Sequence, residues 1–176
     1  MARAAPLRMT AWGRLDHNSD AKMATSTPQP AGYSGTPLPK KLGIKPGHRV
    51  RLVDAPPGFG RTLGELPDGV EVVGDEAEAG LDVIVFFTTS ADALRARFDA
   101  LAGALVPAGM LWIGWPKKAA KVPTDLDENV VRDVALERGM VDVKVCAIDE
   151  TWSGLKLVYR LADRPAVAAK GRNWRG

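Results

Sequence analysis

The chain has 176 residues, of which 45% are apolar and 26% are charged, and its formal net charge is +3. This length and apolar content suffice for one buried core and leave no room for two. No apolar run approaches the ~18 residues that a membrane-spanning helix needs, and the first residues lack the apolar stretch of a signal peptide. We therefore expect a single domain in the cytoplasm, without membrane contact.

Positive charge is concentrated at the two ends of the chain. Residues 1–32 carry a net +2 and residues 165–176 a net +3, which leaves −2 for the residues between them. Neither end shows hydrophobic periodicity, so a disordered tail is expected over 1–32 and a basic flexible tail over 165–176. One α/β domain is expected over 33–164. Because the basicity lies in the tails, no specific nucleic-acid partner is predicted.

The first half of the domain consists of short elements separated by turns. Four elements are expected in this order: a short helix over 39–42, a strand over 49–54, a short helix over 61–66 and a short strand over 70–73. The turn Ala55–Gly60 follows the first strand, and its two glycines permit positive φ and close approach of the backbone. Gly74-Asp75 ends the second strand.

The stretch from Leu81 to Lys118 has the clearest pattern in the chain. The continuous apolar run Leu81–Phe87 is typical of a strand that is buried on both faces, as in a parallel sheet covered by helices. Ser90 can cap the next helix, and Pro107 with Gly109 is expected to end it before a second apolar strand. One apolar stripe of this helix is formed by Leu94, Phe98, Leu101 and Leu105.

The last third predicts a helix followed by two paired strands. Thr124 is expected to cap the helix, with Asp127 at the capping-box position, and Gly139 to end it. Apolar residues then alternate with polar ones over 141–147 and again over 155–161. Because only the short segment Asp149–Gly154 joins these strands, they must be antiparallel.

These elements predict a three-layer α/β fold with a six-stranded, mostly parallel sheet. The expected strand order is 2-1-3-4-6-5, with the last strand antiparallel. This arrangement resembles the Rossmann-like class I methyltransferases with one strand-helix unit missing. The resemblance implies an acidic residue and a glycine-rich turn after the first strand, where Asp54, Gly58 and Gly60 stand and Pro56 replaces a further glycine. It also implies an acidic residue after the second strand that holds ribose hydroxyls, where Asp75 stands.

A second resemblance covers most of the chain from Tyr33 to Arg164. The strings YSGTPLPKKLGIKPG, MLWIGWPKK, TDLDENVVRD and VDVKVCAIDETWSGLK are similar to the small bacterial family of domain of unknown function 3052. This resemblance implies a small soluble domain and carries over no activity and no catalytic residue.

The loops after parallel strands lie at one edge of a sheet, and ligands of such folds bind there. Candidate ligand-binding residues at this edge are Gly58, Gly60, Thr88, Thr89, Trp115, Lys117, Lys118 and Trp152. Two tryptophans, hydroxyls and a lysine pair suit a flat anionic ligand, although a lysine pair in a loop is often only a solvated surface feature.

Two functions from different classes remain open on the sequence. The first hypothesis is a non-catalytic module that uses no cofactor and binds a small anionic or nucleotide-like ligand, or a protein partner. The alternative is a reduced methyltransferase that uses S-adenosylmethionine (SAM), with Asp54 and Asp75 as cofactor-binding residues. No catalytic residue and no metal set is predicted, because the two histidines, His17 and His48, are placed away from this edge and Cys146 lies in an apolar strand.

Overall fold

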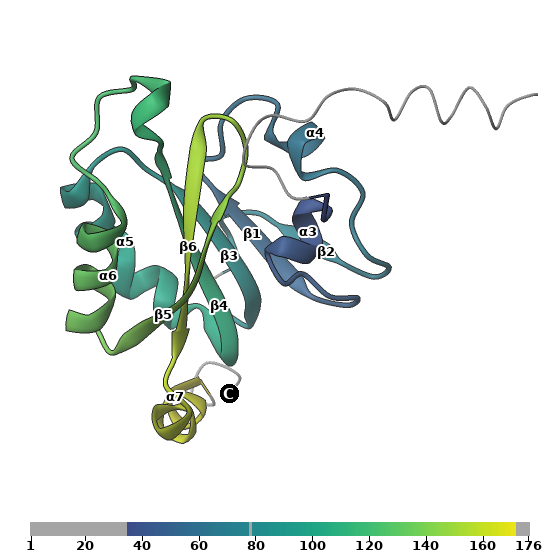
Figure 1. Ribbon diagram of the computed structural model, residues 1–176. Helices are drawn as coiled ribbons and strands as arrows, with labels where there is room; N and C mark the ends of the chain where they lie inside the picture. Colours follow the sequence, from purple (N-terminus) through teal and green to yellow (C-terminus); the bar gives the residue numbers. More distant parts are fainter. Residues whose placement is uncertain (1–34, 78, 172–176) are drawn as a thin grey trace, which may run out of the picture. The chain divides into compact units, whose positions relative to one another are not determined.

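The computed structural model describes residues 35–77 and 79–171, and a six-stranded sheet forms the centre of this part (Figure 1). Its strands are β1 Arg49–Val53, β2 Glu71–Val73, β3 Leu81–Phe87, β4 Leu105–Pro116, β5 Met140–Ala147 and β6 Trp152–Tyr159. They lie in the order β2-β1-β3-β4-β6-β5. Strands β2, β1, β3 and β4 are parallel, and β6 is antiparallel to both of its neighbours. The predicted fold class and strand order are confirmed.

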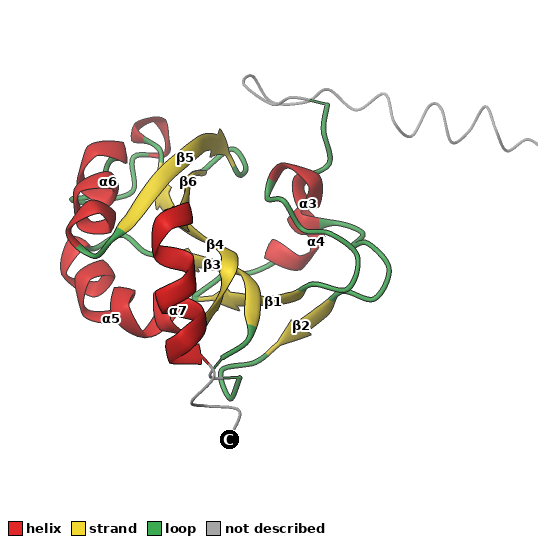
Figure 2. Cartoon of the chain, turned by 90° about the horizontal axis from the view of Figure 1, so that it is seen from below, coloured by secondary structure: helices red, strands yellow, loops and turns green. Residues whose placement is uncertain are grey.

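Helices cover both faces of the sheet. They are α3 Leu38–Lys41, α4 Phe59–Leu63, α5 Ala91–Gly103, α6 Glu128–Glu137 and α7 Arg164–Gly171, with short 3-10 turns η1 Lys118–Ala120 and η2 Leu161–Asp163. Helices α5 and α6 lie on one side of the sheet and α3 and α4 on the other (Figures 1 and 2). Among the described residues, no helix has the length and apolar character needed to cross a membrane.

The central strand β3 supplies side chains to both cores. Ile84 and Phe86 pack in the core beneath α5 and α6, whereas Val83, Val85 and Phe87 pack on the side of α3 and α4. All five side chains are buried, with at most 2% of their surface exposed. Alternation along a strand sends successive side chains to opposite faces, so a continuous apolar run requires cover on both. The predicted burial of this strand on both faces is confirmed.

The boundary between α5 and β4 lies earlier than the sequence suggests. Helix α5 begins as predicted, because the Ser90 hydroxyl accepts a hydrogen bond from the Ala93 amide. It ends at Gly103, and Leu105, expected on the helical stripe, instead pairs with Leu81 in the sheet. Pro107 lies inside β4, where the register with β3 shifts between Leu81 and Val83. Such an irregularity accommodates a residue that has no amide hydrogen for the ladder.

Three further differences lie in the last third of the chain. The cap of α6 is Asp127, whose carboxylate accepts from the Val130 amide, while Thr124 bonds to another loop. Strand β6 runs from Trp152 to Tyr159, so it begins and ends earlier than the alternating segment predicted over 155–161. Residues 165–171, expected to belong to a flexible tail, are part of α7, which packs against β4. The predicted tail over 1–32 and the remainder of the basic tail lie outside the described residues.

Trp112 offers a test of the core on the α3 side. Its side chain is fully buried, and its indole Nε1 donates a hydrogen bond of 2.9 Å to the carbonyl of Leu42. Trp112→Phe removes this donor and leaves a buried carbonyl without a partner, which costs about 1–3 kcal/mol. We expect that loss in the free energy of unfolding measured by urea denaturation. A loss below about 0.5 kcal/mol would contradict the hydrogen bond.

Candidate functional site

The carboxyl ends of β1, β3 and β4 lie at one edge of the sheet, which we call the rim. The first residue of β6, Trp152, pairs with Pro116 at the end of β4 and therefore also lies at the rim. From β1 the chain goes to β2 on one side, and β3 then lies on the other side of β1. Loops that diverge from neighbouring strands in this way open a crevice, and open α/β sheets bind ligands there.

The turn after β1 is tightly constrained by its own residues. Asp54 has a left-handed φ of 53°, and Gly58 has a φ of 78° and precedes the first turn of α4. Pro56 and Pro57 have no amide hydrogen to offer a ligand. The Gly58 amide, however, makes no hydrogen bond to another described residue, and a Cβ at Gly60 would meet nothing within 4 Å. The turn therefore leaves open space and one donor for a ligand.

Both acidic candidates are ion-paired with arginine. The Asp54 carboxylate lies 2.8 Å from Arg97 on α5, and the Arg97 guanidinium also lies 5.1 Å from the centre of the Phe86 ring. Asp75, two residues beyond β2, lies 3.0 Å from Arg51 through Oδ1, and 84% of its side-chain surface is exposed. A pair this exposed contributes little to stability. The other oxygen, Oδ2, makes no hydrogen bond to a described residue and can accept one from a ligand.

The start of α5 is closed by the chain itself. The Ala91 amide donates to the Asp125 carboxylate at 2.8 Å, and the Thr124 hydroxyl donates to the Thr89 carbonyl at 2.7 Å. The Thr88 hydroxyl accepts from the Ser90 amide at 3.2 Å. Asp125 thus places its negative charge at the positive end of the helix dipole. Thr88 and Thr89 lie at the rim, where they fasten this loop.

The two tryptophans do not face each other. Trp115 is 7% exposed and packs in the core beneath α5 and α6, so it lines no open site. Trp152 is half-buried on the opposite side, in edge-to-face contact with Phe87 at 5.1 Å. Phe87 also contacts Phe59 at 4.8 Å. Phe59 and Phe87 are buried, at 3% and 2% exposure, so Trp152 is the candidate that offers aromatic surface at the rim.

The lysine pair divides into one structural and one exposed residue. The Lys117 ammonium donates to the Asp149 carbonyl at 2.7 Å, and the Lys117 amide donates to the Thr151 carbonyl at the same distance. Lys117 thereby ties the end of β4 to the hairpin between β5 and β6. Lys118 is exposed on η1. The two tryptophans and the lysine pair were predicted to form one site. In the structure these residues make separate contacts around the rim.

Sequence reasoning missed Arg51 and Arg97, the partners of the two acidic candidates. Arg51 lies within a strand and Arg97 on a helix that is 43 residues from Asp54 along the chain. The pattern of residues around each arginine in the sequence does not show which distant carboxylate it pairs with. The arginines became identifiable only once the strand order placed α5 beside the end of β1.

Cys146 gives a prediction about pH. Burial raises the pKa of its thiol, an effect that the nearby lysines Lys41, Lys144 and Lys117 only oppose. A raised pKa leaves less thiolate at a given pH, and the thiolate is the reactive form. We therefore expect iodoacetamide to alkylate Cys146 more slowly than free cysteine at pH 8, with a rate that keeps rising above pH 9. Alkylation as fast as that of free cysteine at pH 8 would contradict this.

Comparison with solved structures identifies the fold. The chain resembles a protein of Sulfolobus solfataricus described as a type 11 methyltransferase, with a TM-score of 0.52 and 17% identity over 70% of this chain and 89% of that one. It also resembles the O-methyltransferase NcsB1 of neocarzinostatin biosynthesis, solved with S-adenosyl-L-homocysteine (SAH) and a dihydroxynaphthoic acid. That match has a TM-score of 0.50 and 12% identity over 74% of this chain and 52% of that one. The fold is that of class I SAM-dependent methyltransferases.

No family model and no curated protein matches the chain. The resemblance to domain of unknown function 3052 therefore stays a prediction. The solved structures correct two other expectations from the sequence, namely a non-catalytic binding module and the use of no cofactor. Both of the solved structures named above are described as methyltransferases, and one was solved with SAH, so the comparisons favour the alternative.

Proposed function

We propose that this chain is a small SAM-dependent methyltransferase that binds SAM in the crevice between β1 and β3. The observation that carries the proposal is Asp75, an exposed carboxylate beyond the end of β2 that Arg51 holds through one oxygen. Acidic side chains at this position of dinucleotide-binding folds accept hydrogen bonds from ribose hydroxyls. The methyltransferase fold and the open turn at Gly60 support the same reading.

The chain's own residues would divide the binding work along the rim. Asp75 Oδ2 accepts from the ribose, and the Gly58 amide donates to the amino-acid part of the ligand. The Arg97 guanidinium offsets the negative charge of Asp54 at the turn after β1. Trp152, half-buried on the side of α3 and α4, offers aromatic surface at the rim.

SAM supplies a methyl group on a sulfonium, which passes to a nucleophilic atom of the acceptor as the C–S bond breaks, leaving SAH and releasing a proton from the acceptor. Among the described residues near the turn, Asp54 and Asp75 are both held by arginine, so neither is assigned as a base. The role of the rim is to position the two substrates and limit water, which is sufficient when the methyl donor is already activated.

Amide hydrogen exchange with and without SAM tests the location of the site. We expect SAM to slow exchange in residues 54–60 and 74–77 and to leave α7 unchanged. Formation of SAH on incubation with candidate acceptors tests the activity. Protection that appears elsewhere and spares the turn after β1 would contradict the proposed site, even if SAM binds.

A further inference from the structure

Four lysines gather on the side of the sheet that carries α3. Lys41 ends α3, Lys45 follows in the next loop, Lys144 lies on β5 and Lys156 on β6. Lys144 and Lys156 stand directly opposite each other in the antiparallel pair. The Lys144 ammonium donates to the Lys41 carbonyl at 3.4 Å, and a Cβ at Gly43 would lie 3.8 Å from the Lys156 ammonium. We call these four residues the lysine face.

Repulsion between two lysines of the lysine face, Lys144 and Lys156, destabilises the folded state. Like charges directly opposite in an antiparallel pair are destabilising. Within 35–77 and 79–171, none of Lys45, Lys144 and Lys156 forms an ion pair with a carboxylate, and the ion pairs found there use arginine. Burial, and then the charges of Lys144 and Lys45, lower the pKa of Lys156. A carboxylate in place of Lys144 or Lys156 would remove this repulsion and stabilise the same fold.

The lysine face includes a residue of β6, the strand that begins at the rim. Lys117, at the end of β4, acts electrostatically on the same Cys146 thiol as Lys41 and Lys144. Lys156 lies four residues along β6 from Trp152, which is roughly 13 Å at ~3.3 Å per residue. A nucleic-acid strand carries one phosphate per ~3.4 Å in stacked form, so this distance matches about four phosphates.

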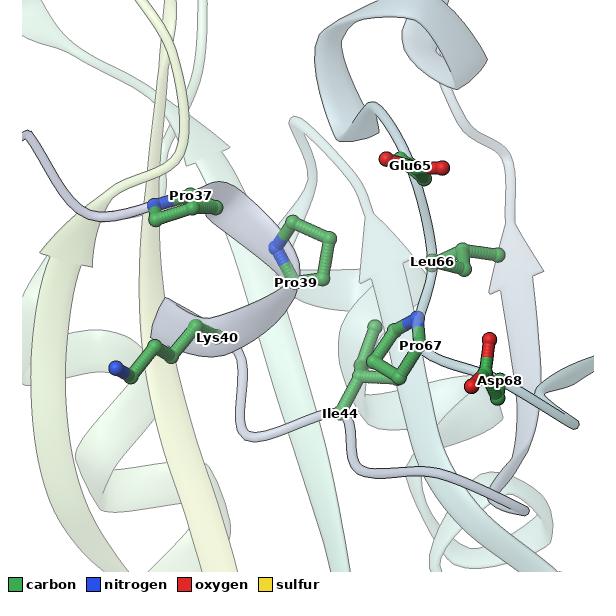
Figure 3. A pocket seen from close by; sticks show the side chains of 8 residues that line it. All are labelled: Pro37, Pro39, Lys40, Ile44, Glu65, Leu66, Pro67 and Asp68. Carbon is green, nitrogen blue, oxygen red and sulfur yellow. The ribbon is translucent and has the colours of Figure 1, made fainter.

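An open surface of this kind does not suit an enclosed small molecule. Small ligands are bound in concave pockets. One pocket, of about 500 Å³, lies elsewhere, between α3 and the loop before β2 (Figure 3). None of its lining residues belongs to the lysine face; they are Pro37, Pro39, Lys40, Ile44, Glu65, Leu66, Pro67 and Asp68.

We propose that the lysine face binds the phosphate backbone of a single-stranded nucleic acid, which is then presented at the rim as the methyl acceptor. The binding part of this inference stands on the lysines alone, and the acceptor part rests on the proposed methyltransferase function. Lysine contacts to phosphate carry no sequence information. Net charge counted by segment places the positive charge in the tails. It does not show this cluster, because Lys41 and Lys144 are 103 residues apart along the chain and only the fold brings them together.

Fluorescence anisotropy tests this with the full chain and a labelled single-stranded RNA of about 12 nucleotides, without SAM and at several salt concentrations. We expect Lys144→Ala with Lys156→Ala to weaken binding about tenfold or more and to reduce the slope of log K against log salt by roughly 1.4, at ~0.7 per lost phosphate contact. Lys144→Arg with Lys156→Arg should restore binding to within about threefold. The matched control, Arg95→Ala with Lys170→Ala, removes two charges from α5 and α7 and should change affinity less than twofold.

Two outcomes would overturn the inference. An unchanged slope in the double alanine variant would place the RNA contact in the tails. Binding to vesicles of anionic phospholipid with no binding to RNA would identify a membrane surface instead. The thermal midpoint of the alanine variant should not fall, because the substitutions relieve repulsion. Binding of RNA without binding of SAM would uphold the face and contradict the proposed function, so the two failures are distinguishable.

Discussion

Replacing Asp75 by alanine is expected to weaken SAM binding about 10- to 100-fold and to leave the fold intact. A hydrogen bond to a charged group contributes roughly 1.5–3 kcal/mol, and each 1.4 kcal/mol is a factor of ten in affinity. The carboxylate is 84% exposed, and among the described residues it contacts only Arg51, at 3.0 Å. Its loss should therefore move the thermal midpoint by no more than a few degrees.

The matched control for this experiment is Asp68→Ala. Asp68 is also an exposed carboxylate, and it precedes β2 whereas Asp75 follows it, so the two lie at opposite ends of the same strand. The control should bind SAM within about twofold of the parent chain. Equal losses in both variants would indicate a general electrostatic effect, and no loss at Asp75 would remove the observation on which the proposed function depends.

Ile84→Ala is expected to cost about 2–5 kcal/mol of unfolding free energy, through lost burial and the cavity left behind. The side chain is fully buried in the central strand, beneath α5. Val72→Ala is the control. Val72 lies on the edge strand β2 and is 50% exposed, so its replacement should cost less than about 0.5 kcal/mol. Urea denaturation measures both. A cost below about 1 kcal/mol at Ile84 would mean that one face of β3 is open to water.

The strand order could be predicted because each rule that determines it needs only a short stretch of the sequence. A continuous apolar run requires two covered faces, a crossover helix requires a parallel neighbour, and a short hairpin requires an antiparallel one. The predicted end of α5 was wrong because Leu105 continues the helical period of apolar residues. In the structure Leu105 instead pairs with Leu81, which gives its side chain a buried place in the sheet. Periodicity alone does not separate these two outcomes.

The candidate site could be predicted only in part. The positions of Asp54 and Asp75 follow from strand ends, and the structure does place them after β1 and β2. Trp115 follows the same rule but turns into the core, because alternation along β4 decides its face. The arginines that hold the two carboxylates, and the lysine face, depend on contacts between segments far apart in the chain. No spacing in the sequence signals them.

Calorimetric titration of SAM into the full chain tests the central claim most directly. We predict one binding site with a dissociation constant below about 1 mM, the upper end of usual substrate affinities, and competition by SAH at the same site. ATP, which shares the adenosine and lacks the sulfonium amino-acid part, should bind more weakly. Absence of heat and of competition at SAM concentrations up to several millimolar, with a cooperatively folded protein, would contradict the assignment of this chain as a methyltransferase.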